Sequence, residues 1–139
     1  MSKEINELNQ TFKKQSIVQA QSGDTVKVHQ KIKEGNKERI QVFQGLVIKT
    51  TNPNNHLHRI LVRRVSNGVG VEKSFLVHSP LVLKIEITKR SKVRRNYLSY
   101  MRNLTGKAAR LNGIEFDRTK VNAVIEPEVV TETSETPTE

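Results

Sequence analysis

Hydrophobic and polar residues alternate over five stretches in the middle of the chain. Alternation with a period of two predicts strands that bury one face. Turn-forming residues separate the stretches, and no long segment with helical periodicity lies between them. We therefore predict a mainly β fold, an antiparallel sheet that closes into a small barrel. The predicted strands cover residues 25–32, 40–48, 57–65, 69–77 and 81–87.

Two local patterns refine this prediction. Gly45 interrupts the second strand, where a glycine usually marks a bulge or a sharp bend. Ahead of the sheet, Ile5, Leu8 and Phe12 recur at spacings of three and four residues. This spacing predicts a short N-terminal helix with one apolar face, capped by Ser2 and packed against another surface.

Residues 89–110 differ from everything before them because they hold eight basic side chains and no acid. Guanidinium groups pair bidentately with phosphate, and tyrosine rings stack on unpaired bases. Tyr97 and Tyr100 lie among these bases and, with neighbouring apolar residues, form a narrow stripe typical of a short helix. We expect an RNA-binding extension that becomes ordered only with RNA. Its candidate residues are Lys89, Arg90, Lys92, Arg94, Arg95, Tyr100, Arg102, Lys107 and Arg110.

A second basic group lies on the predicted strands and consists of Arg59, Arg63, Arg64 and Lys73. Along the strand, Arg64 falls on the same face as Ile60 and Val62, which is the face expected to be buried. Either Arg64 lies near the strand end and stays exposed, or both faces of the strand meet a partner. An ordinary charged outer face is the alternative interpretation of this group.

Charge strengthens the nucleic-acid hypothesis. The 139 residues carry a net charge of +10, and residues 126–139 contain five acids and no base. Residues 1–125 therefore hold 24 bases against 9 acids, a net charge of +15. A body this basic repels itself unless a polyanion neutralises it. The acidic end has low hydrophobicity and is predicted to be disordered.

Composition excludes several classes of protein. The chain has no cysteine, so disulfides, thiolate catalysis and cysteine-bound metal centres are ruled out. Neither a signal peptide nor an apolar run long enough to span a membrane is evident, which favours a cytoplasmic protein. We expect no cofactor and no small-molecule substrate.

The remaining chemical patterns are weak. His56 and His58 would need a third ligand, such as His29 or His78, to hold a metal. Adjacent His78 and Ser79 point to opposite faces of a strand, which does not suit a nucleophile and its base. Gly68 and Gly70 fit a hairpin turn better than a dinucleotide loop. We therefore expect no enzymatic activity.

Five ordered blocks of sequence resemble the L nineteen family of bacterial large-subunit ribosomal proteins. They are GDTVKVH (23–29), RIQVFQGLVI (39–48), VRRVSNGVGVEKSF (62–75), HSP (78–80) and KVRRNYLSYMRNLTGKAARL (92–111). Ser91, Tyr97 and Ser99 depart from the family pattern, which usually has glycine, lysine and tyrosine there. The basic row Lys92, Arg94, Arg95 and Arg102 is kept.

The resemblance implies a small SH3-like barrel with an N-terminal helix and a basic C-terminal extension. It implies binding to large-subunit rRNA (23S), a bridge to small-subunit rRNA (16S), and contact with the large-subunit proteins numbered three and fourteen. The expected division is a helix and lead-in (1–20), the barrel (21–88), the extension (89–121) and the acidic tail (122–139).

A regulator or RNA chaperone that binds RNA transiently is the rival interpretation. In that case the acidic residues 126–139 would fold back as a phosphate mimic, and their deletion would tighten RNA binding markedly.

Overall fold

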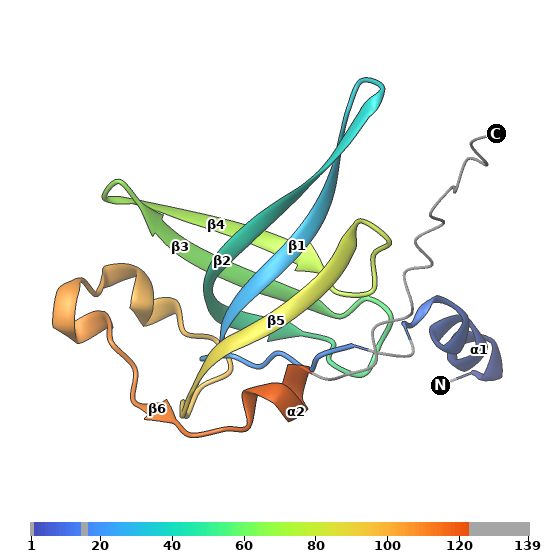
Figure 1. Cartoon of the computed structure of the whole chain (residues 1–139). Helices are drawn as coiled ribbons and strands as arrows, with labels where there is room; N and C mark the ends of the chain where they lie inside the picture. Colours follow the sequence, from blue (N-terminus) through green and yellow to red (C-terminus); the bar gives the residue numbers. More distant parts are fainter. Residues whose placement is uncertain (1, 15–16, 123–139) are drawn as a thin grey trace.

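A curled antiparallel sheet forms the body of the protein. The computed structural model describes residues 2–14 and 17–122, and the predicted acidic tail falls outside these residues apart from position 122. The strand order is β4-β3-β2-β1-β5-β6, and every neighbouring pair is antiparallel (Figure 1). The strands are β1 Thr25–Glu34, β2 Lys37–Thr51, β3 Arg59–Ser66, β4 Val69–Leu76, β5 Val82–Ser91 and β6 Gly113–Ile114. The prediction of a mainly β, SH3-like fold is confirmed.

Alternating residues of these strands build the core. Val26 and Val28 of β1 are fully buried, as are Ile60 and Val62 of β3, while the residues between them are more exposed. Ile87 of β5 joins them in one cluster. The strands form because this period of two gives each of them one apolar face that the curled sheet encloses.

Two hairpins extend beyond the core. The β1–β2 hairpin projects furthest from the barrel, and the β3–β4 hairpin points in a different direction (Figure 1). The second hairpin turns at Asn67 and Gly68, whose φ angles are 52° and 77°. Left-handed values at both central residues define the turn that matches the twist of the strands. The turn therefore pairs Ser66 with Val69 and fixes the register of the whole hairpin.

Of the two features predicted at Gly45, a bulge or a sharp bend, the bulge is absent, because Gly45 pairs regularly with Val26. A Cβ atom there would lie 2.4 Å from the carbonyl oxygen of Arg63, so glycine lets β3 approach β2 closely. The irregularity in pairing occurs further along, where Val47 pairs with Val62 and Lys49 with Leu61. Ile48 is therefore the residue left out of the ladder between β2 and β3.

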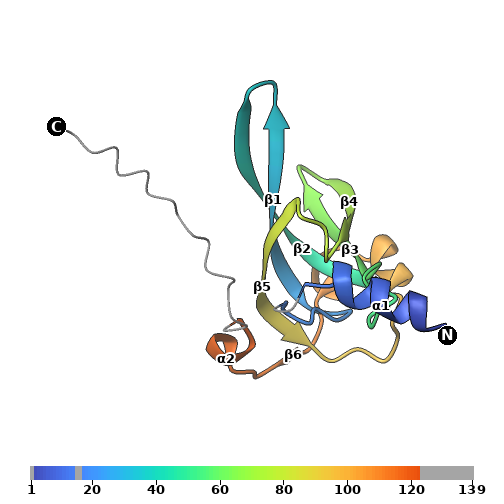
Figure 2. The ribbon, with the colours of Figure 1, turned by 90° about the vertical axis from the view of Figure 1, so that its right-hand side faces the viewer.

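The N-terminal helix α1, Lys3–Phe12, forms as predicted but buries none of its residues. Ile5, Leu8 and Phe12 are 44%, 52% and 61% exposed. Ser2 occupies the N-cap position without a capping hydrogen bond from its side chain. The helix lies on the opposite side of the barrel from residues 99–109 of the C-terminal extension (Figures 1 and 2). The rings of Phe12 and His56 are in contact, and the three apolar side chains of the helix remain exposed.

The basic extension is folded against the barrel, which differs from the expectation of an arm that needs RNA to order. It contains the 3-10 helices η1, Ser99–Asn103, and η2, Gly106–Ala109, and the α-helix α2, Arg118–Asn122. The predicted short helix is thus η1. Leu98 and Met101 pack with Ile48 in a second hydrophobic cluster. The narrow apolar stripe is enough to dock the extension, because the outer face of the barrel contributes apolar residues to the same cluster.

Candidate nucleic-acid interface

The bulge in β2 creates the docking site for the extension. Because Ile48 takes no part in the ladder with β3, its carbonyl oxygen is available, and it accepts a hydrogen bond of 2.7 Å from the Leu98 N–H. Asn96 bonds to the same strand, since its Nδ2 donates to the Thr50 carbonyl at 2.9 Å and its Oδ1 accepts from the Thr50 hydroxyl at 2.7 Å. The Ser22 hydroxyl also donates to the Asn96 carbonyl. These contacts fix the loop that precedes η1.

The docked loop presents a cluster of cations at the surface. Lys92, Arg94 and Arg95 are exposed, and none of them has an acidic partner among the described residues. Together with Val93 and Tyr100 they line a surface hollow of about 430 Å³. The Arg95 guanidinium lies 5.8 Å from the centre of the Tyr100 ring. Two arginines, a lysine and an aromatic face around one hollow can hold phosphates and stack a base.

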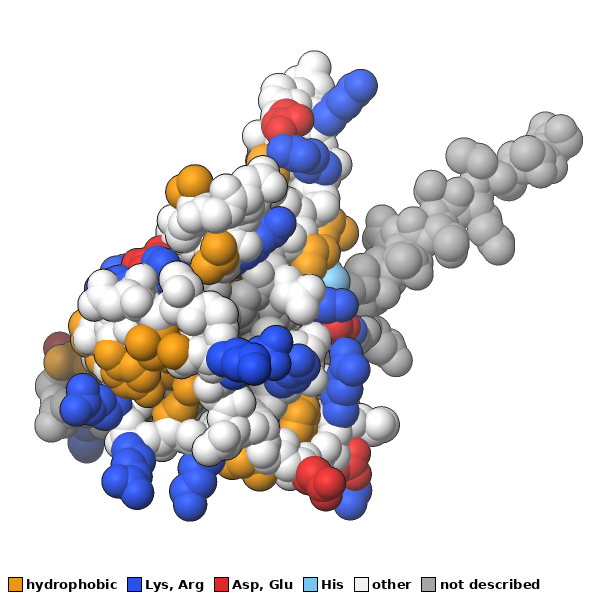
Figure 3. All heavy atoms as spheres, turned by 90° about the vertical axis from the view of Figure 1, so that its left-hand side faces the viewer, with side chains coloured by type: hydrophobic (Ala, Val, Ile, Leu, Met, Phe, Trp, Pro, Cys, Tyr) orange, Lys and Arg blue, Asp and Glu red, His pale blue; other side chains and the backbone are white. Residues whose placement is uncertain are grey.

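The other predicted cations divide into two groups. Lys and Arg side chains gather on the face of the molecule that carries the extension, around an apolar patch, with few acids among them (Figure 3). Within residues 2–14 and 17–122, nine of the twelve predicted bases have no acidic partner. They are Lys89, Lys92, Arg94, Arg95, Lys107, Arg110, Arg59, Arg64 and Lys73.

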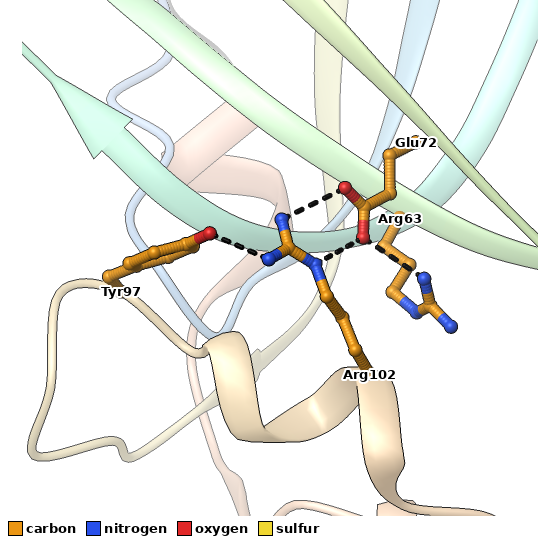
Figure 4. A network of polar contacts seen from close by, with 4 residues as sticks. All are labelled: Arg63, Glu72, Tyr97 and Arg102. Atoms are coloured by element: carbon orange, nitrogen blue, oxygen red, sulfur yellow. Dashed lines mark hydrogen bonds and ion pairs between the residues drawn. The ribbon is translucent and has the colours of Figure 1, made fainter.

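Arg63 and Arg102 belong to the second group because they share one carboxylate, that of Glu72 (Figure 4). Arg102 donates from Nε to Oε1 at 2.6 Å and from Nη2 to Oε2 at 3.0 Å. Arg63 Nη1 donates to the same Oε1 at 3.0 Å. The hydrogen bonds from Arg102 are the largest cause holding the pKa of Glu72 below its usual range, and those from Arg63 add to it. Both arginines are therefore partly neutralised within the protein.

Arg90 likewise has an internal partner, the buried carboxylate of Asp24. Arg90 Nε lies 3.3 Å from Asp24 Oδ1, and the Gln21 N–H donates to Asp24 Oδ2 at 2.9 Å. The Arg90 guanidinium also covers the ring of Phe116 at 5.5 Å. Arg90 thus ties the segment before β1 to the end of β5. Asp24 was missed in the sequence because its partner lies 66 residues away.

The strand bases do not form one cluster. Ile60 and Val62 point into the core, whereas Arg64 is exposed near the end of β3. This agrees with the first of the two alternatives, in which Arg64 lies near the strand end and stays exposed. Arg59 is exposed at the start of β3. Lys73 Nζ donates to Gln30 Oε1 at 2.5 Å and lies 5.3 Å from the Phe75 ring, so it covers part of the barrel.

The histidines hold the lead-in segment against the barrel. His58 and His78 are buried with ring centres 6.3 Å apart, and the Lys14 N–H donates to His78 Nδ1 at 3.0 Å. Burial is the main cause that lowers the pKa of both imidazoles, and both are therefore neutral at pH 7. In the described part of the chain, no three His, Cys, Asp or Glu side chains are grouped to bind a metal.

The chain is similar to known proteins over the barrel and most of the extension. The family model described as Ribosomal protein L19 matches residues 3–113. A "Large ribosomal subunit protein bL19" from Ureaplasma parvum serovar 3 is 50% identical over 107 residues, which are 77% of this chain and 86% of the relative. A "Large ribosomal subunit protein bL19c" from Thalassiosira weissflogii is 49% identical over 109 residues, or 78% and 90% of the two chains. A bL19 protein from an Anaeromyxobacter species is 46% identical over 112 residues, or 81% and 84%.

The matched region includes the barrel and the docked loop with its free cations. Among the described residues, no helix is long and apolar enough to cross a bilayer. The family match covers most of the chain, so both the β fold and the basic loop lie within the matched region. The chain belongs to the L nineteen family of ribosomal proteins, and it is a structural component of the large ribosomal subunit rather than an enzyme.

Proposed function

We propose that the protein binds large-subunit rRNA through the docked loop at residues 92–95 and the exposed bases that follow it. The observation that carries this proposal is the set of unpaired cations, Lys92, Arg94 and Arg95, held with Tyr100 around one hollow. Cations without acidic partners can release counterions from a phosphate backbone, which is the main source of affinity. Because the duplex groove of RNA hides its base edges, recognition relies on backbone shape and on splayed bases that a ring can stack on.

The test replaces Arg94 and Arg95 together by glutamine and measures binding of the full chain to a 23S rRNA transcript at several salt concentrations. We expect affinity to fall by at least about tenfold near 0.1 M salt, and the slope of log K against log salt to become shallower by about 1.4 to 1.8. The matched control replaces Lys33 and Lys37 on the β1–β2 hairpin, which removes the same charge. Wild-type affinity and slope in the Arg94 and Arg95 variant would contradict the proposal.

We also propose that protein neighbours, expected from the family to be the large-subunit proteins numbered three and fourteen, cover the exposed apolar surfaces. One surface is the apolar face of α1, and the other is the end of the β3–β4 hairpin, with Val65, Val69 and Val71 exposed. Large exposed apolar side chains of this kind are typical of interaction sites. The bridge to small-subunit rRNA rests on the family resemblance and on the excess of cations over acids on the extension.

Chemical cross-linking of intact ribosomes, read by mass spectrometry, tests this arrangement. We expect Lys3 at the start of α1 to cross-link to another large-subunit protein, because the helix needs a cover for its apolar face. We expect the RNA cross-links of the chain to concentrate on residues 92–110. Cross-links from Lys3 to rRNA alone would contradict the assignment of α1 to a protein neighbour.

A further inference from the structure

The carboxylate of Glu72 lies at the point where the extension meets the β3–β4 hairpin. Glu72 on β4 is directly opposite Arg63 on β3 in the strand register. A Cβ atom at Gly70 would lie 2.4 Å from Arg63 Nη2, so the glycine leaves room for the guanidinium to lie across β4. The hairpin therefore fixes both Arg63 and the carboxylate it pairs with before the extension adds its own contacts.

Arg102 of η1 closes the extension onto this carboxylate. Its guanidinium makes a bidentate pair with Glu72 and donates from Nη1 to the Tyr97 hydroxyl at 2.7 Å (Figure 4). The Tyr97 ring in turn lies 4.9 Å from Lys49 Nζ of β2. Residues 97–102 are thus held to β2 and β4 at once, and three of the five Arg102 donors are used inside the protein.

We infer that Glu72 is a positioning residue for RNA binding, which acts through Arg102 to hold the loop at residues 92–95 in its binding form. The inference rests on the proposed function. A carboxylate on a phosphate-binding face repels RNA, so its presence there is unfavourable unless it has another effect. The geometry supplies that effect, because Glu72 fixes the arginine that anchors η1. In this account Arg102 docks the extension and leaves phosphate contact to Arg94, Arg95 and Lys92.

Population arithmetic gives the size of the effect. The apparent affinity of a site equals its intrinsic affinity multiplied by the fraction of molecules in the binding form. A partly exposed, bidentate ion pair stabilises a docked segment modestly. Its loss is therefore expected to weaken RNA binding by up to about fivefold.

The test is a double-mutant cycle with Glu72→Gln, Arg102→Gln and both changes together, each in the full chain with a 23S rRNA transcript as the probe. Glu72→Gln makes the protein more positive, and Arg102→Gln makes it less positive. Net charge alone therefore predicts that the two changes shift RNA affinity in opposite directions. Positioning predicts that both weaken binding, by up to about fivefold, and that the double variant is no weaker than the single ones.

Three further measurements sharpen the result. The salt slope of all three variants is expected to match the wild type, since no phosphate contact is removed. Amide hydrogen exchange of residues 97–104 is expected to accelerate while that of β1 and β5 does not change. Glu38→Gln is the matched control, because Glu38 pairs with Lys31 and Lys33 within one hairpin and touches nothing in the extension. It is expected to leave RNA affinity unchanged or slightly raised.

The outcomes separate the two proposals. Equal or tighter binding by Glu72→Gln, or a slope made shallower by about 0.7 or more in Arg102→Gln, would overturn the positioning role and leave RNA binding intact. Additive losses in the double variant would overturn it as well. Failure of the wild-type chain to bind the transcript would overturn the proposed function and, with it, this inference.

Discussion

Single side chains decide which of the predicted cations remain free to bind RNA. The sequence presents residues 89–110 as a uniform basic run, yet Arg90 and Arg102 each face a carboxylate whereas Arg94 and Arg95 do not. The partners of the paired arginines lie 66 and 30 residues away. Charge patterns along a chain carry no information about such distant partners. The sequence therefore predicted the basic run at residues 89–110, but not which of its arginines would be paired with an acid.

The ion pair between Arg63 and Glu72 was within reach of sequence reasoning. The Asn67-Gly68 turn fixes Ser66 opposite Val69, and counting outward along the hairpin places Arg63 opposite Glu72. Opposite charges on directly paired residues stabilise antiparallel strands. Following the register of the predicted hairpin would therefore have identified Glu72 and removed Arg63 from the unpaired cations.

Buried histidines make stability depend on pH. Burial lowers the pKa of His58 and His78, so the folded protein keeps both rings neutral while the unfolded chain takes up protons near the ordinary value of about 6.5. The free energy of unfolding is therefore expected to be highest above about pH 6.5, where both states are neutral at these rings. It is expected to fall as the pH drops from there toward the pKa values of the folded protein. Urea denaturation between about pH 8 and pH 5 measures this dependence, and His58→Leu is expected to make it shallower. Stability that stays constant or rises on acidification would contradict the assignment.

Among the elements, the strands were predictable and the docking of the extension was not. The strands follow from alternation that local sequence displays in full, and their predicted ranges differ from β1 to β5 by a few residues at the ends. The extension has a narrow apolar stripe, which alone indicates marginal order. Its stability comes from Ile48, Leu46 and Leu61 on the barrel, and a sequence pattern does not reveal which outer face of a sheet receives a later segment.

The second hydrophobic cluster predicts a specific mutational effect. Leu98 is fully buried between the extension and Ile48, so Leu98→Ala leaves a cavity and is expected to lower the free energy of unfolding of the docked segment by about 2 to 4 kcal/mol. Hydrogen exchange of residues 96–104, with chemical denaturation of the whole chain, measures the loss. The control is Leu83→Ala on β5, whose side chain is 47% exposed and whose loss is expected to cost under about 0.5 kcal/mol. Equal effects of the two changes would show that the extension does not depend on this cluster.

At the scale of the whole molecule, internal ion pairs distribute the positive charge unevenly. The β1–β2 hairpin pairs Lys31 with Glu38 at 2.6 Å and Arg39 with Glu34 at 2.8 Å. The docked loop has no such acids, so the positive charge left for a polyanion concentrates at the extension. Composition predicts a polyanion partner, and the fold gathers cations with few acids among them on the face that carries the extension.

The attachment of the cationic loop to the barrel suits a fixed structural component. The barrel supplies a rigid body, and the bulge at Ile48 with the carboxylate of Glu72 holds the cationic loop to it. A loop that is already ordered loses little conformational entropy on binding, so its charges act with full effect. This arrangement favours long-lived association over the transient binding expected of a regulator.

Sucrose-gradient fractionation of cell lysate, with the chain quantified by mass spectrometry at moderate and at high salt, tests the central claim most directly. The account predicts that the chain sediments with the large ribosomal subunit at near-unit stoichiometry and remains there at moderate salt. A chain found near the top of the gradient, or released at the first increase in salt, would contradict its role as a structural component that binds rRNA.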